Sequence, residues 1–164
     1  MRRIAKLFVP AVAASLLLAA CGGGSYGSGS GSGATNATVK TAPNAGLGGT
    51  ILVTAQGLTL YRLTAERNGR FICTSACLQL WHPLSVAAGA KPTGIASLGT
   101  IMRPDGSDQV TFQNLPLYTF AQDQNPGDTN GQGVRDVGTW SAIVTRRSSG
   151  ATPAPAPAPR RYGY

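Results

Sequence analysis

The sequence has few of the residues on which catalysis and metal binding most often depend. Its 164 residues include one histidine, His82, three cysteines and six acidic residues. A single histidine excludes a metal centre that needs two imidazoles, and no nucleophile motif accompanies it for Ser-His-Asp catalysis. Paired carboxylates are available in principle at Asp123 and Asp128, but on a turn-rich segment without a recognisable catalytic frame. We therefore expect no enzyme and assign no catalytic residue.

A hydrophobic run long enough to cross a membrane is also missing from the N-terminus. The apolar run at residues 7–20 is shorter than the roughly 20 residues that a membrane helix needs. It follows Arg2, Arg3 and Lys6, and this arrangement is typical of a secretory signal peptide at residues 1–20.

The run ends in Leu18-Ala19-Ala20-Cys21. This stretch resembles the lipobox of bacterial lipoproteins, and the resemblance implies that Cys21 is lipid-modified and becomes the first mature residue. Gly22 occupies the position at which an aspartate commonly marks retention in the inner membrane. We therefore expect the protein to be anchored in the outer membrane. Several acyl chains on one cysteine would give stable anchoring.

Positive charge is concentrated outside the part of the chain that can fold. Of the 14 basic residues, three lie in the signal peptide, one in the following linker and four in the C-terminal tail. The remaining six are balanced by all six acidic residues within residues 47–145. The domain is therefore neutral and lacks the basic stripe that phosphate binding requires, so we expect no nucleic-acid partner.

Composition divides the mature chain into three parts. Residues 21–46 begin with the cysteine and are rich in Gly, Ser, Thr and Ala, which predicts a flexible tether with a reach of about 25–30 Å. Residues 47–145 carry nearly all the large apolar side chains and form one small domain. Residues 146–164 are a basic tail rich in Ala and Pro, which favours polyproline II.

Within residues 47–145 the hydrophobic pattern has a period of two, which predicts an all-β domain. Strand-like runs at 50–55 and 58–64 are joined by Gln56-Gly57, and those at 109–112 and 116–121 by Gln113-Asn114. Only residues 75–81 allow a short helix, which Pro83 would end.

A tyrosine and an acid recur at the same spacing. The pattern Leu-x-Leu-Tyr ends at Tyr61 and again at Tyr118. An acid stands five positions after each tyrosine, Glu66 in the first copy and Asp123 in the second, and the second copy lies 57 positions after the first. Repeats of this kind indicate units that cannot bury their apolar face alone. We expect two duplicated β-hairpins packed face to face with pseudo-twofold symmetry.

The repeat resembles the bacterial secreted-repeat lipoproteins that carry a Tyr-x4-Asp motif. The second copy fits this motif, whereas the first has Glu66 in place of aspartate. Further matching features are Gly49-Thr50-Ile51-Leu52, Cys73-x3-Cys77 followed by Trp81 and Pro83, and the Gly-rich stretch 126–133. The resemblance implies an exported, commonly lipid-anchored protein and adds no established reaction.

The tyrosine and its acid five positions later would point to opposite faces of a straight strand. They can meet only if the chain bends back near residues 64–65 and 121–122. A buried phenol would then donate a hydrogen bond to the carboxylate, with a net stabilisation of about 1–3 kcal/mol. The presence of two copies favours a structural latch over a catalytic pair.

Cys73 and Cys77 are expected to form a disulfide in an oxidising compartment, worth about 2 kcal/mol for so short a loop. The alternative is copper binding or thiol redox chemistry that uses both cysteines, His82 and the more distant Met102.

The oxygen-rich stretch 123–131 is expected to form turns, and the alternative for this stretch is calcium binding. Trp81 and Trp140 are expected in the core. The alternative is that their rings form a surface on which sugars stack.

These observations predict a membrane-anchored, non-enzymatic lipoprotein without a cofactor, facing the periplasm or the cell surface. Its role would be structural, or an interaction with an envelope protein or polymer. The alternative function is a periplasmic copper-binding or thiol-redox protein.

Overall fold

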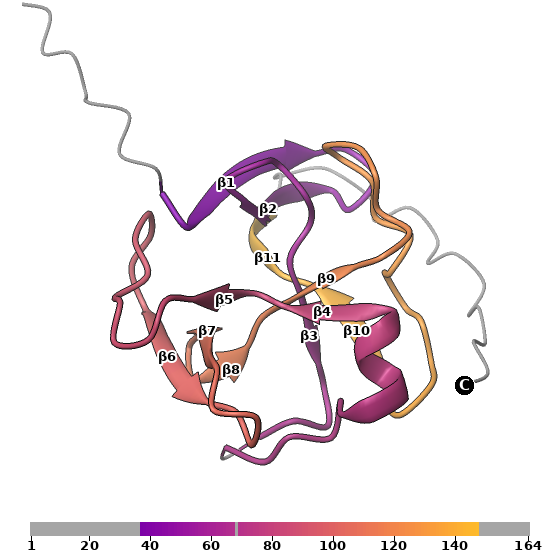
Figure 1. Ribbon diagram of the computed structural model, residues 1–164. Coiled ribbons are helices and arrows are strands. Elements are labelled where there is room, and N and C mark those ends of the chain that lie inside the picture. The colour runs from indigo at the N-terminus through magenta and orange to yellow at the C-terminus, as the bar shows by residue number, and fades with distance from the viewer. Residues whose placement is uncertain (1–36, 68, 148–164) are drawn as a thin grey trace, which may run out of the picture. The chain divides into compact units, whose positions relative to one another are not determined.

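The computed structural model describes residues 37–67 and 69–147, which all belong to one compact unit of the chain (Figure 1). The predicted signal peptide, the predicted lipidation site Cys21, most of the predicted tether and most of the predicted tail lie outside the described residues. Within the described part, no helix has the length and hydrophobicity to cross a membrane.

Short antiparallel strands form three sheets, which confirms the all-β prediction. The first sheet has the order β1-β2-β11: β1 (Val39–Asn44), β2 (Gly49–Thr54) and β11 (Val144–Arg147). The second has the order β10-β3-β9-β4: β10 (Trp140–Ala142), β3 (Tyr61–Leu63), β9 (Tyr118–Phe120) and β4 (Trp81–Pro83). The third has the order β5-β7-β6, with β8 paired to β7: β5 (Ser85–Val86), β7 (Asp108–Phe112), β6 (Leu98–Met102) and β8 (Leu115–Pro116). The expected short helix is a 3-10 helix, η1 (Ser75–Gln79).

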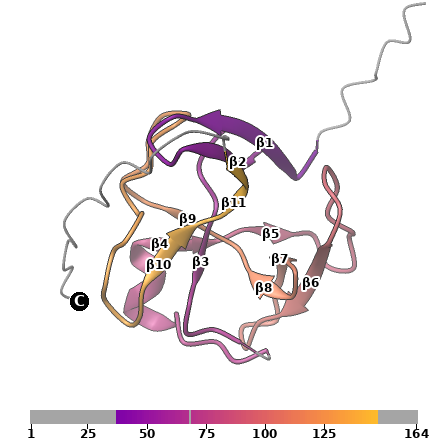
Figure 2. The same ribbon diagram turned by 180° about the vertical axis from the view of Figure 1, so that it is seen from behind.

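The two halves of the domain exchange their final strands. β1 to β5 belong to the first repeat and β6 to β11 to the second, yet β11 pairs with β2 and β5 pairs with β7. In the middle sheet the repeats meet where β3 pairs with β9, with Tyr61 directly opposite Tyr118. Figures 1 and 2 show this middle sheet between the other two. Each repeat therefore completes a sheet of the other.

The predicted hairpins exist only at their tips. Gln113 and Asn114 have φ values of 51° and 63°, which is the left-handed conformation of a two-residue hairpin loop, here between β7 and β8. In the first repeat the turn relies on Gly57, with φ of 93°, and a single bridge joins Val53 to Thr59. After each turn the chain continues into a strand of the middle sheet, β3 or β9, where Tyr61 and Tyr118 are buried.

The domain starts earlier and ends later than the composition predicted. β1 lies within the expected tether, pairs with β2 along its whole length and buries Val39 completely. β11 likewise extends through Arg146 and Arg147 into the expected tail. Both are outer strands of their sheet, whose backbone hydrogen bonds hold them with few apolar side chains, and composition therefore did not reveal them.

The core consists of two clusters. Adjacent residues go to different clusters, as Leu60 and Tyr61 do and as Leu117 and Tyr118 do, because neighbouring side chains of an extended chain point in opposite directions. One cluster holds the two motif tyrosines, both tryptophans and the disulfide-bonded cysteines Cys73 and Cys77, and the other is aliphatic. The repeated motif therefore places its tyrosine in the aromatic cluster.

Candidate functional site

The two motif tyrosines lie at the centre of the aromatic cluster. Tyr61 and Tyr118 are cross-strand neighbours on β3 and β9, and neither has any exposed surface. Each ring packs edge-on against a tryptophan, Tyr61 against Trp81 at 5.4 Å and Tyr118 against Trp140 at 5.1 Å between centroids. The hydroxyl groups must find their hydrogen-bond partners inside the protein.

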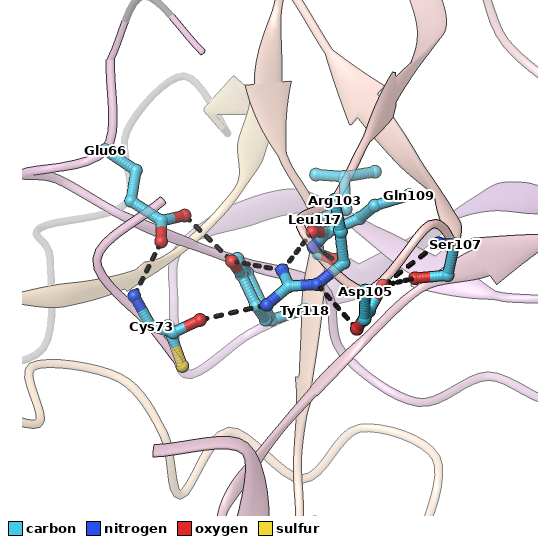
Figure 3. Close-up of polar contacts among 8 residues, drawn as sticks. All are labelled: Glu66, Cys73, Arg103, Asp105, Ser107, Gln109, Leu117 and Tyr118. Carbon is cyan, nitrogen blue, oxygen red and sulfur yellow. Dashed lines mark hydrogen bonds and ion pairs between the residues drawn. The ribbon is translucent and has the colours of Figure 1, made fainter. Parts of the chain in front are cut away.

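The hydroxyl of Tyr118 is bound to the acid of the first repeat. It donates to Oε2 of Glu66 over 2.9 Å, and Oε1 of Glu66 accepts from the backbone N–H of Cys73 at 2.8 Å (Figure 3). The same Oε1 also accepts from the backbone N–H of Ile72 at 2.8 Å. Glu66 is 1% exposed. The carboxylate therefore closes its own following loop with one oxygen and holds the other repeat with the second.

A buried arginine completes this cluster. Arg103 is 3% exposed, and its Nη1 donates to Oε1 of Gln109 at 2.6 Å and to the Tyr118 hydroxyl at 3.1 Å. Its Nη2 donates to the carbonyl of Cys73 at 3.0 Å. Figure 3 shows the guanidinium between these partners, with Asp105 as an ion pair at 3.7 Å from Nε. The phenol thus joins a buried cation to a buried anion.

The hydroxyl of Tyr61 makes the reciprocal contact. It donates to Oδ2 of Asp123 at 2.5 Å and accepts from the N–H of Gly131 at 3.3 Å. Oδ1 of Asp123 accepts from the N–H of Asn130 at 2.8 Å, seven residues further on. That separation equals the one between Glu66 and Cys73, so both acids close an equivalent loop. No arginine contacts this second pair among the described residues.

The prediction that each tyrosine binds the acid of its own motif was wrong. Each pairs with the acid of the other repeat, 62 positions away for Tyr61 and 52 for Tyr118. The chain does not bring each tyrosine back to the acid five positions later, because each acid binds backbone N–H groups of the loop that follows it. The cross-strand register of β3 and β9 then brings each phenol within reach of the other repeat's carboxylate.

Electrostatics keep both phenols protonated. Burial raises the pKa of the Tyr61 hydroxyl, and Asp123 raises it further. Burial also raises the pKa of Tyr118, and the charge of Glu66 adds to this while Arg103 opposes it. A phenol that keeps its proton acts as a hydrogen-bond donor and not as a base or nucleophile. The arrangement is suited to holding two repeats together.

The cysteines form the predicted disulfide, with Cα atoms 5.3 Å apart. Cys73 has no exposed surface and Cys77 has 2%. His82 does not join them, because it is exposed on β4 next to the buried Trp81 and points to the opposite side of the strand. In the described part of the chain, no three His, Cys, Asp or Glu side chains are grouped as metal ligands.

The tryptophans lie in the core, as expected. Trp81 and Trp140 stack with ring centroids 3.7 Å apart, and both are fully buried. Both indole N–H groups donate to Asp136, to Oδ2 at 3.0 Å and to Oδ1 at 2.8 Å. This shared carboxylate is a second link between the repeats, and its role was not predicted. Nor was that of Arg103, for which the sequence carries no motif.

The oxygen-rich stretch 123–131 forms turns. Oδ2 of Asp128 accepts from the N–H groups of Gln124 and Asn125, at 3.0 and 2.9 Å. Asp123 is already bound to Tyr61 and Asn130. The carboxylates of this segment therefore close its own loop, as the turn interpretation expected.

Fold and site together define a two-repeat β-domain that is closed by reciprocal phenol–carboxylate hydrogen bonds. Residues 99–143 match the model of a family described as a secreted repeat of unknown function. The match begins in β6, ends just before β11 and contains Tyr118 and Asp123, so the resemblance seen in the sequence is confirmed for the second repeat. A secreted repeat agrees with an extracellular or envelope location. No curated protein and no solved structure matches the chain.

Proposed function

We propose that this protein is a non-enzymatic lipoprotein of the cell envelope, anchored through Cys21. Its two-repeat domain would serve a structural or interaction role. One observation carries the proposal: the groups that define the repeat are committed to one another inside the core. Tyr61 and Tyr118 have no exposed surface, Glu66 has 1% and Asp123 has 4%. A substrate could not reach them without unfolding the domain.

The anchoring part of the proposal rests on the lipobox and on the match to a secreted repeat. An acylated Cys21 would hold the domain at the outer membrane, facing the periplasm or the cell surface. Two or more acyl chains on the cysteine give stable membrane attachment, whereas a single acyl chain does not.

The substitution Cys21→Ala tests the anchor. The wild-type chain is expected in the membrane fraction and the variant in the soluble fraction, with the same thermal unfolding midpoint for both. Removal of the domain's own disulfide by Cys73→Ala and Cys77→Ala is the matched control, because it should lower the midpoint and leave the membrane association unchanged. Membrane association that survives in C21A would overturn the anchor.

The structural role is tested by replacing both phenols. Tyr61→Phe combined with Tyr118→Phe removes two hydroxyl groups and leaves the rings in place. The expected result is a large fall in the unfolding midpoint of an otherwise intact protein. An unchanged midpoint together with the loss of the chain's biological output would contradict the proposal.

The copper or thiol-redox alternative requires free sulfur at Cys73 and Cys77. A count of free thiols on the native exported protein, followed by copper titration after reduction, separates the two functions. We expect no free thiol in that region and no tight copper complex. Facile reduction with one-to-one copper binding would favour the alternative instead.

A further inference from the structure

Three cavities lie beside β3 and the chain that follows it, and they share lining residues with one another. The largest, about 590 Å³, borders Arg67 and Gln113, and a second of about 290 Å³ borders Arg62 and Gln113. A third of about 170 Å³ borders both arginines. Because they share these residues, we treat them as one depression, here called the arginine groove. Its volume is in the range of ligand sites.

The arginines of this groove lack a counter-ion. Arg62 and Arg67 are both exposed, and no acidic residue lines any of the three cavities. Within residues 37–67 and 69–147, the Arg62 side chain has neither a hydrogen bond nor an ion pair, and the Arg67 side chain makes one hydrogen bond, from Nε to the Thr64 carbonyl at 3.3 Å.

The acids of the domain are already engaged elsewhere. Glu66 and Asp123 bind the tyrosines, and Asp136 binds the indoles. The other three accept hydrogen bonds from loop N–H groups: Asp105, Asp108 and Asp128. The formal neutrality of the domain therefore hides a local excess of positive charge at the groove.

The remaining lining is neutral and rich in hydrogen-bonding groups. Gln113 and Asn114 are both exposed at the tip of the β7–β8 hairpin, and Thr100 and Thr145 lie beside them. Amides and hydroxyls both donate and accept, which matches the hydroxyl groups of a sugar. Partly buried apolar side chains also line the cavities, among them Ile101, Phe112, Leu115 and Val144. The groove therefore offers both apolar contact and hydrogen-bonding groups.

We propose that the arginine groove binds an acidic glycan, a sugar chain that carries carboxylate or phosphate groups. Arg62 and Arg67 would pair with its anionic groups through their planar guanidinium N–H donors, and Gln113 and Asn114 would bind its hydroxyls. The proposal rests on the interaction role proposed above and names the chemistry of the partner.

Binding of polygalacturonate, a carboxylated sugar chain, to the immobilised full-length protein tests this. The variant Arg62→Gln/Arg67→Gln should weaken binding about tenfold or more, as expected for the loss of two charge-assisted hydrogen bonds. The matched control is Lys91→Gln/Arg135→Gln, which removes the same charge from exposed residues that line none of the three cavities. It should change binding by less than about twofold, since charges outside the groove are screened.

Two other probes complete the test. Neutral dextran and poly-L-glutamate should each bind at least about tenfold more weakly than polygalacturonate, because each lacks one of the two recognised features. Equal effects of the two double variants would overturn the site. Poly-L-glutamate binding as tight as polygalacturonate binding would overturn the glycan assignment. Neither result would alter the membrane release of C21A, so failure here is distinct from failure of the proposed anchor.

Discussion

At the scale of single residues, the two motif tyrosines hold matching positions but meet different charges. The Tyr118 hydroxyl lies between Glu66 and Arg103, whereas the Tyr61 hydroxyl meets Asp123 and a backbone N–H. Removing one partner of a buried hydrogen bond costs more when the group left without its partner is charged. The same chemical change should therefore have unequal effects at the two positions.

Tyr118→Phe is expected to lower the free energy of unfolding by about 3 kcal/mol and Tyr61→Phe by about 1–2 kcal/mol. The first leaves two buried charged groups short of a hydrogen bond, and the second leaves one. Urea unfolding of both variants at neutral pH measures the difference. Equal losses would show that Arg103 does not depend on the Tyr118 hydroxyl.

Asp123 is expected to make the stability of the domain depend on pH. Burial raises the pKa of its carboxyl above the ordinary 3.8, against the hydrogen bonds from Tyr61 and Asn130. A carboxyl with a higher pKa in the folded state contributes stability that is complete below the unfolded pKa and is lost as pH rises through the folded pKa.

The free energy of unfolding of the wild type minus that of Asp123→Asn should consequently fall as pH is raised from about 3 to about 8. Carboxyls common to both proteins, including Asp105 and Asp128 with their lowered pKa, cancel in this difference. Urea unfolding across this pH range provides the measurement. A difference that grows with pH would mean that the Asp123 pKa is lowered in the fold.

At the scale of secondary-structure elements, the two repeats are joined mainly by the exchanged strands β5 and β11. β11 lies against β2 with Arg147 opposite Gly49, and a Cβ atom at Gly49 would overlap the carbonyl oxygen of Arg146. The glycine is required here by the close approach of two backbones. Side-chain packing cannot relieve such an overlap, because both atoms belong to the main chain.

Gly49→Ala should therefore destabilise the domain by about 1–3 kcal/mol, the usual range for overpacking. Gly46→Ala in the neighbouring turn is the control, since a Cβ there comes no closer than 3.4 Å to the Asn44 side chain. Thermal unfolding compares the two, and amide hydrogen exchange should show faster exchange in β11 for G49A only. Equal stability of both variants would count against a tight β2–β11 joint.

At the scale of the whole molecule, the motif acts between repeats. A double-mutant cycle on Tyr118→Phe and Glu66→Gln should give a coupling energy of about 1 kcal/mol or more. The cycle that combines Tyr118→Phe with Asp123→Asn should give a coupling near zero, although these two residues belong to the same motif. The reverse pattern would restore pairing within each repeat.

The sequence predicted the strand content, the disulfide and the duplication, because each depends on local spacing. Alternating side chains, a Cys-x3-Cys pair and two copies of one motif are all visible within short windows. The exchange of partners was not visible. Tyr61 and Tyr118 have equivalent surroundings in the sequence, and only the register of β3 with β9 determines which acid each phenol reaches. The role of Arg103 was missed for the same reason, since its hydrogen-bond partners lie 6 to 30 positions away.

Reciprocal exchange implies that neither repeat can fold alone. The first repeat would lack β11, the Asp123 carboxylate and Trp140, while the second would lack β5 and Glu66. The exposed residues 87–91 join the repeats, so the chain can be divided between residues 89 and 90 without cutting a strand.

We expect each separate fragment to give the circular dichroism of an unfolded chain, and an equimolar mixture to regain the signal of the intact protein. The stacked pair Trp81 and Trp140 reports directly on reassembly, because each fragment carries one of the two rings. A second fragment that ends after Ala142 is the control, since it keeps Trp140 and Tyr118 but has no β11 to give to β2. A fragment that folds without its partner would show that the exchanged strands are dispensable, and the domain would then be two modules in contact instead of one interlocked fold.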